Sequence, residues 1–385
     1  MEISAQENEE INQLKEHKFL GLIVADIENN KNMNILEKRF LYNILKLLNQ
    51  KEINIENFKT LLLKGNLDLY PNLRSLSWKF LLGYINNKPY EWENYLDTKR
   101  NFYNNEKEKH IKKNSHIKFK NHPLDIQSNS NYSGLLKDNQ LNELIDKDIK
   151  RTRTEVNFFS EKINPKKNET HYDILKRILF FYAKLHPDIG YVQGFNEILA
   201  TIYYCYSKDK NLYFKEGIEA DSFYCLEKLI NLFPEIYIAS KDYDENGIRR
   251  KINYIKFILY VIDYEVFANL RENKIDIYMF LFRWFSLFFS QEFSIESTMK
   301  IWDFLFCQNN IEQYLNVLCL SALRIKRKEL CSKQISDIMM ALQDFNDNDV
   351  NAILNQVDEI SVEIENKNSR LTKENFYEFL KIHCK

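Results

Sequence analysis

Glycine and proline are scarce in this 385-residue chain, with 8 and 6 copies. A protein with many strands needs more tight turns than these residues can supply, so their scarcity favours helices joined by polar loops. Hydrophobic residues nevertheless make up 44% of the chain and aromatic residues 14%, which is enough to bury a sizeable core. The composition therefore predicts an all-α protein.

The chain also lacks an excess of charge of either sign, because its formal net charge is −1. A strongly basic surface is not required, so nucleic acid is not expected as a partner. The most apolar stretch, residues 278–289, is interrupted by Arg283 and is shorter than the roughly 18 residues of a membrane span. The first ten residues are polar and acidic, unlike a signal or transit peptide. We expect a cytoplasmic protein without a membrane span.

Motifs for the common enzyme chemistries are missing as well. The six cysteines include no CxxC pair and no His/Cys cluster at zinc spacing, so they are interpreted as reduced core residues. The patterns GxxxxGK[ST], GxGxxG, HExxH and GxSxG do not occur. The chain is therefore not expected to bind a nucleotide, a cofactor or a metal by itself.

Apolar residues recur at three- and four-residue intervals along most of the chain, which is typical of helices. Residues 1–50 are predicted to form a helical extension that the core does not need, residues 51–345 the main domain, and residues 346–385 terminal helices packed on it. Two lobes are expected to meet near residues 212–217. The polar segment 101–140 is interpreted as a loop or insertion that holds one short helix at most.

Two segments carry residues that could act on a partner. The first includes Asp148 and Arg151; a run with charges of both signs is usually a solvated helix face, and the neighbouring cations Lys150 and Arg153 leave the functional residue open. The second runs from Gly190 to Glu197 and places Gln193 between two glycines, where another surface could approach closely. In the alternative interpretation, Gln193 and Asn196 only cap the following helix.

Two further segments are expected to be architectural. Arg74 and Trp78 lie four residues apart, hence on one helix face, which predicts a buried arginine near the indole ring. Arg283 and Glu292 are expected to form an internal ion pair among aromatic residues.

Taken together and in this order, the segments resemble the TBC domain, the helical GTPase-activating domain for Rab GTPases. The resemblance covers roughly residues 55–345 and is carried by five ordered motifs. They are Leu73-Arg74 with Trp78; Ile145, Asp148 and Arg151-Thr152; Tyr191, Gln193-Gly194-Phe195-Asn196; Arg283-Trp284 with Leu287-Phe288 and Glu292-Phe293; and Ile301-Trp302-Asp303 with Phe306. Residues 122–159 and 177–185 look most like the single-domain TBC proteins of the thirteenth human subtype.

The resemblance implies an elongated, two-lobed helical TBC fold with short helical extensions at both ends. It implies that Arg151 is an arginine finger and Gln193 a glutamine finger, both supplied in trans to a Rab-family GTPase in its GTP state. The same motifs contain five supporting or Rab-contacting residues. These are Arg74, Asp148, Tyr191, Gly194 and Asn196.

GTP and Mg²⁺ would arrive with the partner, and the Rab would recruit the protein to the surface of endomembranes during vesicle trafficking. The alternative is a Rab-binding scaffold on the same fold without catalytic effect. A helical-repeat adaptor would show a period of about 30–45 residues, which is absent here. Phe195 replaces the methionine that is usual after Gln-Gly, residues 69–71 replace the common Gly-Ile-Pro, and residues 1–50 have no counterpart in the family core.

Overall fold

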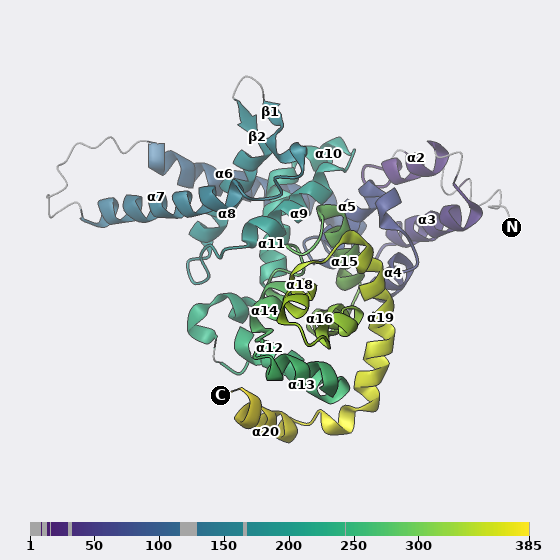
Figure 1. The fold of residues 1–385 in the computed structure, drawn as a ribbon. Coiled ribbons are helices and arrows are strands. Elements are labelled where there is room, and N and C mark those ends of the chain that lie inside the picture. The colour runs from purple at the N-terminus through teal and green to yellow at the C-terminus, as the bar shows by residue number, and fades with distance from the viewer. Residues whose placement is uncertain are drawn as a thin grey trace. The chain divides into compact units, whose positions relative to one another are not determined.

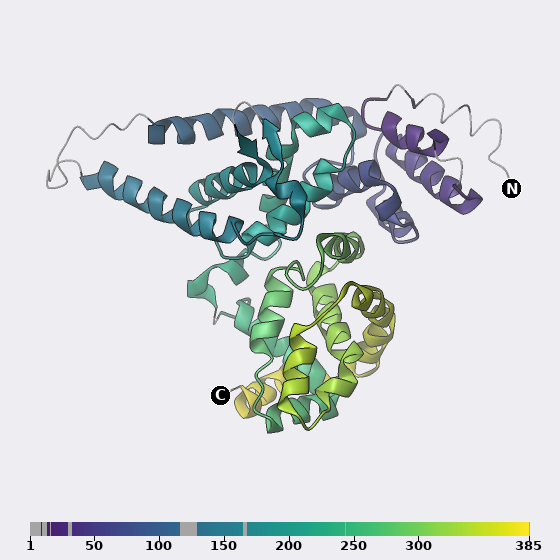
Figure 2. The ribbon, with the colours of Figure 1, turned by 45° about the horizontal axis from the view of Figure 1, so that its top comes forward.

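The structure of the protein is a computed structural model that describes residues 9, 14–15, 17–29, 33–115, 129–164, 168–242 and 244–384. Helices dominate these residues (Figure 1), so the predicted all-α class is confirmed. The chain divides into two compact units, unit 1 from Met1 to Leu232 and unit 2 from Phe233 to Lys385. Figure 2 shows the helices of each unit from a second direction.

Unit 1 contains α-helices, short 3-10 helices (η) and one strand pair in its described residues. In chain order its helices are α2 (Gly21–Asn29), α3 (Ile35–Leu48), α4 (Ile55–Leu62), η1 (Leu67–Leu69), α5 (Pro71–Leu81), η2 (Pro89–Glu91), α6 (Trp92–Ser115), α7 (Asn129–Ile149), η4 (Asn157–Ser160), α8 (His171–Leu185), α9 (Phe195–Ser207), α10 (Leu212–Glu216) and α11 (Ile218–Ile230). The strands β1 (Lys162–Asn164) and β2 (Glu169–Thr170) pair in antiparallel orientation. The sequence predicted no strand; this pair is too short for alternation to show.

The regular elements among the described residues of unit 2 are all helices. In chain order they are η5 (Pro234–Tyr237), η6 (Ala239–Lys241), α12 (Ile248–Ile262), α13 (Tyr264–Glu272), α14 (Tyr278–Ser286), α15 (Ile295–Phe306), α16 (Ile311–Ile325), α17 (Arg327–Leu330), α18 (Ile335–Gln343), α19 (Asp347–Asn366), η7 (Asn368–Arg370) and α20 (Lys373–His383). The predicted terminal helices are found as α19 and α20, and α19 packs along α16.

The ends of α8 follow from its sequence. The side chain of Thr170 accepts a hydrogen bond from the backbone N–H of Asp173, and the carboxylate of Asp173 accepts one from the backbone of Thr170. This capping box satisfies backbone donors that the first helical turn leaves free. The helix ends at Leu185, because the Pro that follows His186 disfavours a helical conformation for that residue. Local sequence signals therefore set both ends of α8.

The core of unit 1 is built around α9. Every residue from Phe195 to Tyr206 is buried, as expected for a helix that is apolar on nearly all sides. The helices α8, α11 and α5 pack against it. Gly194, the residue before this helix, belongs to the motif that contains Gln193. The buried helix α9 therefore fixes the position of that motif.

The prediction of a loop at residues 101–140 is wrong for the described residues. The helix α6 continues to Ser115 and α7 begins at Asn129, while residues 116–128 lie outside the described part. The buried stripe of α6 includes a cation, Arg100, between Leu96 and Tyr103. That charged residue breaks the apolar pattern, so the helix could not be recognised from periodicity alone.

The boundary between the two units falls after Leu232, later in the chain than the predicted 212–217. Arg100 explains why α10 and α11 stay with unit 1. Its guanidinium donates to both carboxylate oxygens of Asp221 on α11, at 2.9 and 2.7 Å, and to the carbonyl of Tyr213 on α10 at 3.0 Å. A Cβ atom at Gly217 would lie 2.0 Å from the Arg100 guanidinium carbon, so this glycine permits close packing and marks no hinge.

The described part of residues 1–50 packs on the rest of unit 1. Phe19 is 6% exposed and lies in an aromatic cluster with Trp92, Tyr213 and Phe214. The helix α3 packs on α4, and α2 contacts α5. The expectation that the core does not need this segment is therefore revised, whereas domain boundaries at residues 50 and 345 stay predictions.

The apolar stretch at residues 278–289 forms α14 and the turn after it. Its cation Arg283 donates to Glu292 over 2.7 Å, and the Glu292 side chain is only 2% exposed, so the predicted ion pair is confirmed. In the described part of the chain, we find no helix with both the length and the apolarity that crossing a bilayer requires.

Candidate functional site

Arg151 lies in a turn at the end of α7, residues 150–155, which we call the arginine turn. The Arg151 backbone N–H donates to the carbonyl of Asp148 over 3.0 Å, and its Nη2 donates to Oδ1 of Asp148 over 2.5 Å. The side chain of Arg151 is 67% exposed, whereas that of Asp148 is 4% exposed. A buried carboxylate thus holds one edge of the guanidinium while most of the side chain faces solvent.

Gln193 lies between α8 and α9 in residues 190–194, which we call the glutamine loop. This loop has a positive φ at Gly190 (69°) and at Gly194 (103°), a conformation that is unfavourable for most residues other than glycine. Gln193 is exposed, and its side chain makes no hydrogen bond within the described part of the chain. Gly194, which has no side chain, is the N-cap of α9. The interpretation of Gln193 as a helix cap is therefore wrong, whereas Oδ1 of Asn196 does accept a hydrogen bond from the N-cap backbone N–H.

Hydrogen bonds through Asp148 on α7 and Asn196 on α9 connect the arginine turn with the glutamine loop. The hydroxyl of Tyr191 donates to Oδ2 of Asp148 over 2.7 Å. Nδ2 of Asn196 donates to Oγ1 of Thr152 over 2.9 Å, while Oδ1 of Asn196 accepts from the backbone N–H of Gly194 over 3.1 Å. Burial and the bond to Asp148 raise the pKa of Tyr191, so the phenol remains a donor at neutral pH. The two loops therefore share one polar scaffold.

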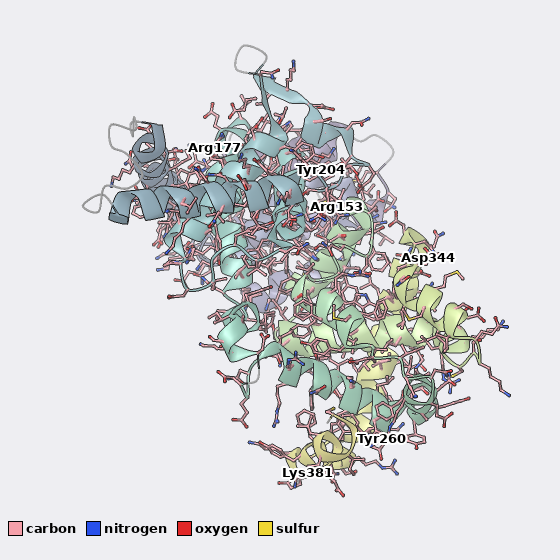
Figure 3. The ribbon with its side chains drawn as sticks, turned by 60° about the vertical axis from the view of Figure 1, so that its left-hand side comes forward. Arg153, Arg177, Tyr204, Tyr260, Asp344 and Lys381 are labelled. Carbon is pink, nitrogen blue, oxygen red and sulfur yellow. The ribbon has the colours of Figure 1, made fainter. Side chains whose placement is uncertain are left out.

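An ion pair that the sequence did not predict adds to this scaffold. Arg153, labelled in Figure 3, has a side chain only 5% exposed, and its Nε lies 3.0 Å from Oε2 of Glu197 on α9. The backbone of Arg153 has a φ of 45°, which is uncommon for a residue with a side chain. Burial raises the pKa of Glu197 to about 7, although Arg153 acts in the opposite direction.

The neighbouring cations thus have different surroundings. Lys150 and Arg151 are exposed, whereas Arg153 is buried and occupied by Glu197. Arg153 is consequently not available to another protein surface. The sequence alone did not decide which of these cations is exposed, because burial at a turn depends on the helix that packs behind it.

Arg74 lies on α5, and its Nη2 is 2.6 Å from Oδ1 of Asp68 on η1. The residue is 5% exposed and Trp78 is fully buried. The guanidinium therefore ties η1 to α5, as a mainly architectural arginine would. A direct role of Arg74 toward a partner stays a prediction.

No role was predicted from the sequence for the other residues of the scaffold. The hydroxyl of Tyr172 on α8 donates to the backbone carbonyl of Thr152 over 2.8 Å, and Oγ1 of Thr152 donates to the carbonyl of Asp148 over 2.8 Å. Glu197 was visible only as an acidic residue at the start of an apolar helix. Among the described residues, no group of His, Cys, Asp and Glu side chains is arranged to hold a metal ion.

Comparison with known proteins defines the class to which this fold and site belong. A family model of the Rab-GTPase-TBC domain matches residues 71–331, which is more than half of the chain. The chain therefore belongs to the RabGAP-TBC family.

Relatives and solved structures agree with this assignment. The chain is 28% identical to TBC1 domain family member 13 of Homo sapiens over 397 aligned residues, covering 85% of this chain and 99% of that protein. It is 25% identical to the GTPase-activating protein gyp1 of Schizosaccharomyces pombe over 304 residues, covering 74% of this chain and 54% of that protein.

The fold is similar to the crystal structure of the Ypt/Rab-GAP domain of Gyp1p. That comparison gives a TM-score of 0.66 at 19% sequence identity and covers 84% of this chain and 98% of the other. The predicted TBC fold is thereby confirmed.

Proposed function

We propose that the protein accelerates GTP hydrolysis by a Rab-family GTPase in its GTP state, supplying Arg151 and Gln193 in trans. The observation that carries the proposal is the position of Asp148. Its buried carboxylate accepts from Arg151 at 2.5 Å and from Tyr191 at 2.7 Å. One group therefore orients both an exposed guanidinium and the loop that carries an exposed amide. Membership in the family supports a Rab as the partner.

The guanidinium of Arg151 would act on the charge that develops during hydrolysis. Negative charge spreads over the phosphate oxygens in the transition state, and an arginine inserted from outside stabilises it, raising the rate by about 10³–10⁵. The five N–H donors of a guanidinium form a planar fork that matches phosphate oxygens. Because Asp148 engages one edge of this fork, the other donors stay free to face the partner.

The amide of Gln193 would position the attacking water. A side-chain amide can accept a hydrogen bond from water and donate one to a phosphate oxygen at the same time. Gln193 has no competing hydrogen bond in the described structure, and the loop that holds it takes positive φ angles at two glycines. The Rab's own glutamine would then be partly redundant.

The supporting residues have different tasks in this mechanism. Asp148 and Tyr191 orient the two loops, and Asn196 closes the glutamine loop onto the arginine turn. Gly194 allows the chain to enter α9 directly after Gln193. GTP and Mg²⁺ would come with the Rab, so the chain itself would hold no cofactor. Binding to a membrane-attached Rab would place the otherwise cytoplasmic protein at the surface of endomembranes.

Single-turnover hydrolysis by a panel of purified, GTP-loaded Rabs tests the proposal. At least one Rab should release phosphate faster by about 10³ or more. Arg151→Ala should remove most of the acceleration, whereas Lys150→Ala, which removes the exposed cation beside it, should retain it. Tight binding of a GTP-loaded Rab without any acceleration would contradict the proposal and identify a scaffold instead.

A further inference from the structure

Unit 2 contains a cavity of about 540 Å³ that lies outside the site described above. Its walls come from α12, α13, the connection from α13 to α14, the start of α14 and the end of α20. Cavities of a few hundred cubic ångströms commonly bind small molecules. No residue of the arginine turn or the glutamine loop belongs to this cavity, so its chemistry can be considered independently.

The charges that line the cavity are mostly positive. Arg249, Lys256, Arg271 and Lys274 contribute cations, and Asp276 contributes the one carboxylate side chain among the described residues of the lining. Lys256 lies 3.1 Å from Asp276, so this pair neutralises itself. Arg271 and Lys274 have no carboxylate within ion-pair distance in the described part of the chain. A cavity with unneutralised cations is therefore present in a protein whose net charge is −1.

The backbone holds these cations in place. Arg271 and Lys274 lie at the end of α13 and just after it, where the N–H of Lys274 donates to the carbonyl of Arg271 over 3.0 Å. The N–H of Ile275 donates to the carbonyl of Leu270 over 2.8 Å, and Lys274 has a φ of 56°. Two cations are thus kept on one tight turn although their charges repel each other.

Arg249 adds a cation from another helix, α12. It belongs to the first turn of α12, where the helix dipole favours acidic residues, yet this turn has none. Its guanidinium lies 5.3 Å from the centre of the Tyr278 ring, which keeps it at the cavity. His383 lies in the same lining, and burial together with Arg271 lowers its pKa. Basic groups from three parts of the unit therefore surround one space.

We propose that this cavity binds a small anion that carries several phosphate groups. Arginine supplies a planar fork and lysine a compact charge, the combination that binds phosphate oxygens. Apolar side chains such as Phe267 and Ile277 line the remaining wall and would contact a ring that carries the phosphates. Such an anion can be a soluble phosphorylated ring or the headgroup of a phosphorylated lipid.

Binding of two probes to the full chain tests the proposal and separates the two sources. The soluble probe is inositol 1,4,5-trisphosphate, measured by titration calorimetry. The membrane probe is a phosphatidylcholine vesicle containing phosphatidylinositol 4,5-bisphosphate, compared with a phosphatidylserine vesicle of equal charge. Binding of the soluble probe alone identifies a soluble ligand. Binding of both probes, with preference over phosphatidylserine, identifies a headgroup site.

Charge-matched variants decide whether the cavity is responsible. The double variant Arg271→Gln/Lys274→Gln should weaken binding by about tenfold or more for each lost charged contact. The control Lys328→Gln/Arg370→Gln removes the same charges from exposed positions of unit 2 outside this cavity and should bind as the wild type does. Binding of neither probe, equal binding to both kinds of vesicle, or equal loss in both double variants would overturn the proposal. Thermal melting checks that each variant is folded.

Discussion

Arg151 and Arg153 are two positions apart, yet only the side chain of Arg151 is accessible to another protein. The Arg153 side chain is 5% exposed and lies against Glu197, because a buried cation requires a compensating partner. The Arg151 side chain is 67% exposed and is oriented by a buried carboxylate. A finger residue needs both accessibility and orientation, since disorder of the cation would reduce its effect on the transition state.

Replacing Arg151 by lysine keeps the charge but removes the planar fork. We expect Arg151→Lys to lose most of the acceleration in single-turnover hydrolysis, because a lysine ammonium is strongly hydrated and cannot bind two oxygens side by side. The melting temperature should stay nearly unchanged, since the side chain is largely exposed. Near-full activity of Arg151→Lys would instead direct attention to Lys150.

Glu197 predicts a pH dependence of stability. Its pKa is about 7 in the folded protein, so the folded state binds a proton more tightly than the unfolded chain, whose ordinary value is 4.5. The resulting stabilisation is complete below about pH 4.5 and is lost as the pH rises to about 7. Glu197→Gln should therefore have a flatter stability profile across this range. Urea titrations at several pH values measure the free energy of unfolding of both proteins. If this free energy changes with pH equally in wild type and variant, the assignment is contradicted.

Arg74 can be tested for two roles at once. Arg74→Ala should lower stability by about 1–3 kcal/mol, because it removes the ion pair between a buried guanidinium and Asp68. Asp68→Asn breaks the same pair but keeps the guanidinium, and it serves as the matched control. If Arg74 also contacts the Rab, only Arg74→Ala should lose activity at a temperature where both variants are folded. Unchanged melting and unchanged activity of Arg74→Ala would remove this residue from the site.

At the scale of elements, local signals determined which helices could be predicted. The capping box at Thr170 and the Pro after His186 are local signals for the two ends of α8, and α20 lies within the terminal helices predicted at residues 346–385. The helix α6 was not predicted, because its buried face carries Arg100. This arginine forms an ion pair with Asp221, which lies in a distant part of the sequence. Such a pair becomes visible only when the two helices are seen together.

The N-terminal segment carries a prediction at this scale. Phe19→Ala should destabilise the protein by about 3–5 kcal/mol, because the ring is 6% exposed in an aromatic cluster with Trp92 and Phe214. Leu36→Ala removes an apolar side chain that is 78% exposed in the same segment and should have little effect. Thermal or urea unfolding measures both variants. Equal, small effects would show that the segment does not complete the core.

At the scale of the whole molecule, the two units have different tasks in this account. The family match spans residues of both units, whereas the residues proposed to act on GTP lie in unit 1 and the basic cavity lies in unit 2. The resemblance of short motifs was sufficient to name Arg151 and Gln193. It could not reveal the bonds between their loops, since Asp148 and Tyr191 meet only through folding. The net charge of −1 likewise concealed a local group of cations.

The central claim is that this chain supplies its own water-positioning amide. The measurement is single-turnover GTP hydrolysis by a cognate Rab and by the same Rab with its switch glutamine changed to leucine, each with wild type and with Gln193→Ala. We predict that the wild type still activates the leucine Rab at least in part. Gln193→Ala should cost about 10²–10³ in rate on the normal Rab, as expected for a lost transition-state donor. Full activity of Gln193→Ala on the normal Rab, with no activation of the leucine Rab by the wild type, would contradict the account.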